Sequence, residues 1–306
     1  MSQYIIRRLL WGVLTIITVS VLIFAIVYAM PGDPVRMIAD PRMPAEEVEV
    51  LRERWGLDRP PHEQFFHWFT NILQGDLGFS IQTRQPVSHL ILTRLHFTLY
   101  LTVTALIFRY FVGVMIGLLV GFKRGGWLDK ILVVTTVILR SLPDFWLGII
   151  LILLFAVQIP IFPVSGYDGP FSVTLPMLAL ALPLIATTMR LTRSEVLEIV
   201  KEQYVRTAYA KGLRKRTVML KHVLRNALIP VTVVFFLSIP WLIGGAVVVE
   251  SVFAWPGMGR LLWQAISAQD LPIVQGIVFI IAIITVISNT IGDIICAILD
   301  PTIRYN

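Results

Sequence analysis

Long apolar runs, separated by short polar segments, constrain this 306-residue chain more than any other feature. A helix needs about 20 mostly apolar residues to cross roughly 30 Å of hydrocarbon. Six runs approach or exceed that length: residues 9–30, 97–121, 131–158, 173–190, 228–249 and 273–299. Only 15% of the residues are charged and the mean hydropathy is +0.78, whereas about a quarter of a soluble domain is charged. The sequence therefore predicts an all-α polytopic membrane protein with six transmembrane helices.

The first apolar run follows Arg7 and Arg8, which is also how a secretory signal peptide begins. A cleaved signal has an apolar stretch of about 7–15 residues and a small-residue cleavage site. This run is longer and has no clear site of that kind. Cleavage is therefore the weaker alternative, and we expect a retained helix.

The basic residues predict the orientation of the spans. Residues 190–225 carry ten Lys and Arg side chains, whereas 159–172 carry none and 250–272 carry only Arg260. Cytoplasmic loops are enriched in Lys and Arg, so both termini and the 190–225 segment are predicted to be cytoplasmic. The net charge of +7 is then explained by topology and does not indicate binding to nucleic acid.

Residues 31–96 form one long connector, predicted to lie outside the membrane. Pro44, followed by Glu46 and Glu47, favours a helix start, and residues 75–78 (GDLG) favour a turn. A second helix is predicted to have a broad apolar face, made of Phe65, Phe66, Trp68, Phe69, Ile72 and Leu73. This face either packs on the bilayer or the spans, or binds an extracellular partner.

Motifs for catalysis are missing from the sequence. Residues 62–66 (HEQFF) begin like the zinc motif HExxH, but Phe66 occupies the position of the second ligand. The chain has no phosphate-binding loop and no nucleophile elbow, and the single cysteine, Cys296, lies in the last apolar run. We therefore expect no catalytic residues, no metal site and no cofactor in this chain.

Four charged residues fall inside the predicted spans: Arg109, Arg140, Asp144 and Asp293. Charges at bilayer depth cost several kcal/mol unless they are paired or hydrated. One interpretation is a pair of ion pairs, Arg140 with Asp144 and Arg109 with Asp293. The other is that these residues line a polar transport pathway.

The most basic stretch of the chain covers residues 204–230. Its pattern predicts a helix that ends at Gly212 and a second helix over 217–226, with Pro230 in the first turn of the fifth span. Charge alone leaves two alternatives for this stretch, a topology signal that touches anionic headgroups or a site for a partner protein.

The order of residues in this stretch resembles the EAA signature of ATP-binding-cassette (ABC) importer permeases, in the version found in dipeptide, oligopeptide and nickel permeases. The matching positions are Thr207, Ala208, Ala210, Lys211, Gly212, Ile229 and Pro230. Further segments resemble that subfamily: PGDP (31–34), WGLD (55–58), GDLG (75–78), VESVFAWPGMGRL (249–261) and DPTIRY (300–305). The subfamily also has Thr at the position of Thr207, whereas Asp144 replaces a residue expected to be small or uncharged.

The resemblance implies a pore-forming subunit in a bacterial or archaeal inner membrane, with residues 1–96 as a first span plus an outer segment. Residues 97–303 would then be the permease core, with a coupling loop at 190–230. The implied partners are a second homologous permease, two cytoplasmic ATPases that bind ATP and Mg²⁺, and an extracytoplasmic binding protein. The implied substrates are dipeptides or oligopeptides, with nickel complexes or glutathione as alternatives. An ATP-independent transporter or channel and, more remotely, a membrane enzyme are the rival classes.

Overall fold

The computed structural model describes residues 2–29, 44–54, 58–122 and 127–299 of the chain. Within these ranges the chain is helical apart from its connectors, and its one β contact is an isolated bridge between Phe79 and Pro86. The α-helices are α1 (Ser2–Ala29), α3 (Ala45–Arg54), α4 (Pro61–Leu73), α5 (Val87–Phe122), α6 (Trp127–Ser141), α7 (Asp144–Ile152), α8 (Thr174–Ile199), α9 (Gln203–Ala210), α10 (Lys215–Thr217), α11 (Leu224–Leu237), α12 (Ile239–Val252), α13 (Met258–Ser267) and α14 (Leu271–Leu299). The π-helices η1 (Leu153–Gln158) and η3 (Val218–Val223) and the 3₁₀-helix η2 (Pro170–Val173) complete the described elements.

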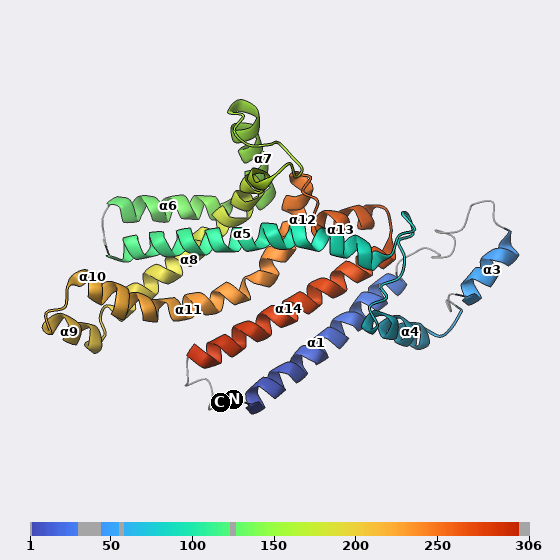
Figure 1. Ribbon diagram of the computed structural model, residues 1–306, viewed down its shortest axis with the longest axis horizontal. Helices are drawn as coiled ribbons and strands as arrows, with labels where there is room; N and C mark the ends of the chain where they lie inside the picture. Colours follow the sequence, from blue (N-terminus) through green and yellow to red (C-terminus); the bar gives the residue numbers. More distant parts are fainter. Residues whose placement is uncertain (1, 30–43, 55–57, 123–126, 300–306) are drawn as a thin grey trace.

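Helix α8 packs on α5 and on α11 within an elongated molecule (Figure 1). Helix α6 packs on α8, and α14 packs on α11 and separately on α1. An ion pair between Arg8 and Asp293 joins the start of α1 to the last part of α14. These two helix ends therefore lie at the same end of the molecule, as a topology with both termini on one side requires.

The contact between α5 and α8 depends on a stripe of glycines. Gly113, Gly117 and Gly121 are four residues apart, so they lie on one face of α5. A Cβ atom at Gly117 would come 2.7 Å from the backbone oxygen of Met189, and one at Gly113 would come 2.7 Å from the Cβ of Thr188. Small residues at this spacing let two membrane helices approach closely, and here they fix the centre of the bundle.

The outer segment confirms several predictions from the sequence. Helix α3 begins directly after Pro44, and the side chain of Asp76 accepts a hydrogen bond from the N–H of Gly78 in the predicted turn. The ring of Phe24 on α1 lies 5.5 Å from that of Phe65 and 5.9 Å from that of Trp68. Part of the apolar face of α4 therefore packs on a span, whereas Phe66 and Leu73 of that face are exposed. Segments 31–34 and 55–57 lie outside the described residues.

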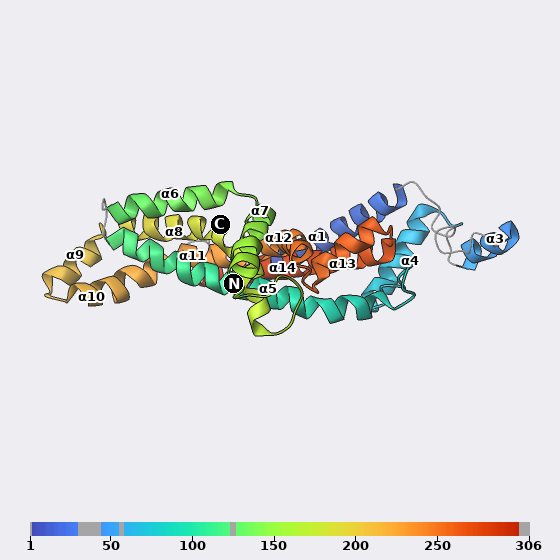
Figure 2. The same ribbon diagram turned by 90° about the horizontal axis from the view of Figure 1, so that it is seen from above.

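The third predicted span, residues 131–158, is not one continuous helix. The chain breaks at Leu142 and Pro143 into α6 and α7, which meet at an angle of 102°. Proline has no N–H to continue a helix and disfavours the helical conformation for the residue before it, so Pro143 explains the break. Both views show α7 running steeply across the long axis of the molecule (Figures 1 and 2).

The boundaries of the fifth span, predicted as 228–249, are also wrong. The apolar segment long enough to cross a membrane is Lys215–Leu237, and α12 is a separate, shorter apolar helix. The change of direction falls at Ser238, two residues before Pro240, which lies in the first turn of α12. Helices α5 and α8 extend beyond their predicted ends, to Val87 and Ile199. The described residues thus contain five helices that could each span a membrane, or six if the bent α6–α7 pair counts as one.

Candidate coupling segment and polar sites

Helix α9 is a short helix at one end of the molecule, beyond the ends of α8 and α11 (Figures 1 and 2). It contains eight residues and follows Glu202, whose backbone is extended (φ −62°, ψ 146°). This extended residue separates α9 from the end of α8, so α9 is a distinct unit joined to α8 by a sharp turn.

Gly212 ends α9 in the way its position in the sequence predicted. Its φ is +78°, the left-handed conformation that favours glycine. The N–H of Gly212 donates to the oxygen of Tyr209 at 2.9 Å, and that of Leu213 donates to the oxygen of Ala208 at 3.3 Å. This pair of hydrogen bonds is a Schellman motif, which satisfies carbonyls that the helix end would leave without partners.

One face of α9 is buried and the other is exposed. Val205 and Ala208 are packed against Val196 of α8 and against Val218 and Val223 of η3. Thr207, Ala210 and Lys211, which belong to the EAA-like positions, are exposed, and the hydroxyl of Thr207 donates to the oxygen of Gln203. The exposed positions thus form one surface of this helical segment, and the opposite face of α9 packs against α8 and η3.

The two halves of the EAA-like stretch form one folded unit. The side-chain amide of Asn226 donates to the hydroxyl of Tyr204 at 2.7 Å, and the hydroxyl of Tyr209 contacts the sulfur of Met219 at 3.6 Å. Spacing alone gives no signal for these contacts, since each joins residues from different helices. The prediction that Pro230 lies in a first helical turn is wrong, because residues 215–229 already continue into α11 and place Pro230 in its interior.

The two arginines of the predicted spans both bind threonines of α8. Nε of Arg109 donates to Thr188 at 3.1 Å, and an η-nitrogen of Arg140 donates to Thr187 at 2.9 Å. Arg109 is 3% exposed, and its guanidinium carbon lies 5.0 Å from the centre of the Tyr110 ring. Arg140 is exposed at the end of α6, so of the two arginines only Arg140 is open to a partner or solute.

Both predicted ion pairs are wrong. Asp293 pairs with Arg8 and not with Arg109, and among the described residues no ion pair joins Arg140 to Asp144. Asp144 is the first residue of α7, where a carboxylate interacts favourably with the N-terminal end of the helix dipole. The Pro143 break explains why the i, i+4 spacing of Arg140 and Asp144 does not place them on one helix face.

A buried carboxylate that the sequence did not single out organises the segment around residues 253–260. Glu250 is fully buried; its side chain accepts from the hydroxyl of Thr98 at 2.6 Å and from the N–H of Arg260 at 3.0 Å. The same Thr98 hydroxyl accepts the N–H of Met258 at 2.7 Å. A side chain at Gly257 would overlap the Glu250 carboxylate, which explains why the first glycine of the segment FAWPGMG is a glycine.

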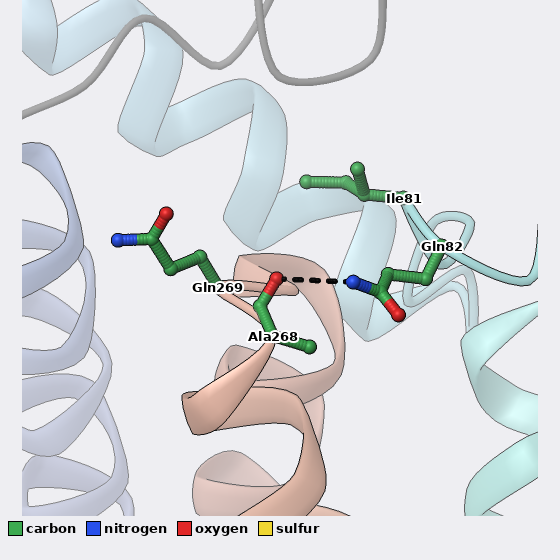
Figure 3. Close-up of a pocket in the computed structure, with 4 residues that line it drawn as sticks. All are labelled: Ile81, Gln82, Ala268 and Gln269. Carbon is green, nitrogen blue, oxygen red and sulfur yellow. Dashed lines mark hydrogen bonds between the residues drawn. The ribbon is translucent and has the colours of Figure 1, made fainter.

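A second buried carboxylate lies beside a cavity at the same end of the molecule. Asp270 is 1% exposed and accepts from the hydroxyl of Ser80 at 2.5 Å and from the N–H of Gln82 at 3.2 Å. The adjacent cavity of about 400 Å³ is lined by Ile81, Gln82, Ala268 and Gln269. The amide of Gln82 reaches across it to the oxygen of Ala268 at 3.4 Å (Figure 3).

The described residues contain no group of three or more His, Cys, Asp or Glu side chains that could hold a metal ion. The buried polar groups described above mainly form hydrogen bonds between segments that are distant in the chain. What the geometry presents is a multi-span helical bundle with an anchored, exposed short helix at one end.

This arrangement has the fold of a type I importer permease. It is similar to a chain of the MetNI methionine ABC transporter, solved in inward-facing conformations, with a TM-score of 0.56 and 19% sequence identity. The match covers 69% of this chain and 96% of that chain.

Sequence comparison gives the family. Residues 113–305 match the model of the binding-protein-dependent transport system inner membrane component, and residues 1–102 match that of its N-terminal region. The chain belongs to this family of multi-pass transport components. It is 39% identical, over the full length of both chains, to the glutathione transport system permease protein GsiC of Escherichia coli (strain K12), and equally to GsiC of Salmonella typhimurium (strain LT2).

Proposed function

We propose that this chain pairs with a second, homologous permease and is driven by two cytoplasmic ATPases, to which it couples through α9. The observation that carries the proposal is the anchored α9 helix, whose outward face has Thr207, Ala210 and Lys211. ATP and Mg²⁺ would be bound by the ATPase subunits, and an extracytoplasmic binding protein would deliver the solute.

The contacts of α9 support a lever mechanism. Because α9 shares an apolar cluster with the end of α8 and with η3, which continues into α11, a force on α9 would be passed to both long helices. Closure of the ATPases would then rock α8 and α11 and switch the pathway between inward and outward access. Ala208, Gly212, Ile229 and Pro230 would keep this unit rigid.

For the substrate we propose a small anionic peptide of the glutathione type. Two full-length relatives named above are glutathione permeases, and Arg140 offers a cation that has no acidic partner among the described residues. An exposed charge at bilayer depth is costly unless it faces a hydrated path or a partner subunit. Arg140 therefore suits a pathway wall that meets carboxylates, which favours a peptide over a nickel complex.

Uptake into vesicles that contain the whole transporter tests both the dependence on ATP and the proposed substrate. We expect labelled glutathione to enter only when ATP is present on the ATPase side. Arg140→Gln should lower glutathione uptake more than uptake of a neutral dipeptide. Uptake without ATP would indicate a secondary transporter instead, and an equal effect of Arg140→Gln on both solutes would remove Arg140 from the pathway.

A further inference from the structure

A second cavity opens where the coupling unit, made of α9, η3 and the first part of α11, meets the last span. It has a volume of about 470 Å³ and is lined by Tyr204 of α9, by residues of η3 and α11, and by Ile298 of α14. It thus lies between helices distant in sequence, at the end of the molecule predicted to be cytoplasmic.

The polar wall of this cavity is basic. Lys221, His222 and Arg225 line it, and no Asp or Glu is among its lining residues. Within the described parts of the chain, none of the three forms an ion pair. The cavity therefore concentrates positive charge without an internal counter-ion, and an anionic ligand would supply one.

The opposite wall is apolar. Ile229 belongs to the candidate span Lys215–Leu237, and Ile298 is the last residue of the candidate span Leu271–Ile298. The basic residues Lys221 and Arg225 lie in the first half of one candidate span, and Ile298 ends the other, so the cavity lies toward the cytoplasmic ends of both spans, near the headgroups of the inner leaflet. A water-soluble anion would gain nothing from these isoleucines, whereas a lipid has an acyl chain to place against them.

Two neutral donors complete the cavity. The hydroxyl of Tyr204 and the amide of Asn226 are hydrogen-bonded to each other at 2.7 Å, and both line the cavity. They are positioned to bind the hydroxyl groups of a glycerol headgroup beside the phosphate.

The geometry points to a binding site for an anionic phospholipid with a glycerol headgroup, here phosphatidylglycerol. Lys221 and Arg225 hold its phosphate, Tyr204 and Asn226 bind its headgroup hydroxyls, and Ile229 and Ile298 contact its acyl chain. Basic pockets between membrane helices on the cytoplasmic side bind anionic headgroups by this chemistry. A lipid held there would add a connection between Tyr204 of α9 and the end of α14.

Native mass spectrometry of the whole transporter with graded phosphatidylglycerol tests the site. The double variant Lys221→Gln/Arg225→Gln should bind phosphatidylglycerol about thirty-fold more weakly, which corresponds to about 2 kcal/mol for two charges at about 1 kcal/mol each. Phosphatidylcholine should bind weakly to wild type and variant alike, and inorganic phosphate should not displace the lipid.

The matched control is Lys215→Gln/Arg216→Gln, which removes two charges from the same basic run but outside the cavity. It should retain lipid binding, as should the charge-preserving Lys221→Arg/Arg225→Lys. Equal losses in the two neutralising variants would show a diffuse surface effect and overturn the site. So would displacement by inorganic phosphate, or equal binding of phosphatidylcholine. Because lipid binding is read without transport, these outcomes are independent of the proposed substrate and of coupling.

Discussion

The two ends of the molecule are held together by different physical means. At the end with α13, Glu250 and Asp270 are buried almost completely, and each accepts hydrogen bonds from residues more than 150 positions away in the chain. At the end with α9, apolar contacts around Val205 and Val218 hold the coupling unit, and Gly212 in the left-handed conformation ends α9.

This difference bears on which end can move. Buried carboxylates with several donors tolerate only one arrangement, because any displacement leaves buried polar groups without partners. Apolar contacts are not directional, so a small unit resting on them can shift as a body at lower cost. We therefore expect the Glu250 end to stay fixed while the α9 end changes position.

The largest effect is expected from Glu250→Ala. It leaves the donors of Thr98 and Arg260 without their acceptor, at roughly 1–3 kcal/mol for each buried group. The yield of folded protein and its melting temperature in detergent should fall sharply. Glu198→Ala, at an exposed position of α8, serves as the control and should change neither. A normal melting temperature for Glu250→Ala would contradict the proposed rigidity of this end.

Asp270→Ala should have a smaller effect of the same kind. It removes the acceptor of the Ser80 hydroxyl and the Gln82 N–H, and we expect a loss of about 2 kcal/mol in the free energy of unfolding. Thermal unfolding measures this, with the exposed Asp168 changed to Ala as the control. Equal stability of the two variants would show that Asp270 does not hold the 80–82 segment.

At the α9 end, Gly212→Val should affect coupling more than folding. A Cβ at Gly212 meets no atom within 4 Å, so the penalty comes from the positive φ alone, at about 1–2 kcal/mol or more for a β-branched residue. ATPase activity stimulated by loaded binding protein should drop while the complex still assembles.

Gly212→Asn, which tolerates this conformation better, should retain most of that activity. Lys215→Gln should be near normal, since its side chain is exposed beyond α9. Normal transport by Gly212→Val would mean that the capped helix is not the coupling element.

The smallest structural effect, and the test of which end faces the cytoplasm, comes from cysteine reporters in a Cys296→Ala background. Ser165 and Lys215 are both exposed, so replacing either with cysteine should leave stability unchanged. An impermeant thiol reagent should label the Ser165 site in intact cells and the Lys215 site only after permeabilisation. Labelling of the Lys215 site in intact cells, and of the Ser165 site only after permeabilisation, would place the α9 end outside the cytoplasm.

Local features were predictable from the sequence. The stop at Gly212, the helix after Pro44 and the apolar face of α4 each depend on residues close together in the chain. The resemblance in the EAA-like segment likewise identified a family that full-length comparison confirms.

Features that depend on distant residues were not predictable. Thr98 carries no local sign that it will bind Glu250, and Arg8 none that it will pair with Asp293. Spacing suggested that Arg140 and Asp144 share a helix face, but the break at Pro143 changes the direction of the chain between them. The same holds for the end of α11, where hydropathy continues smoothly through Ser238 while the backbone turns.

Helix α5 fixes the rotational orientation of two contact sites relative to each other. Its 36 residues make a rod of about 54 Å, with Thr98 about a third of the way along it and the Gly113–Gly117–Gly121 stripe near its C-terminal end. One residue inserted between them would rotate the stripe by about 100° relative to Thr98, so that only one of the two contacts could form. The number of residues between Thr98 and the glycine stripe is therefore fixed by two contacts that lie on different sides of the bundle.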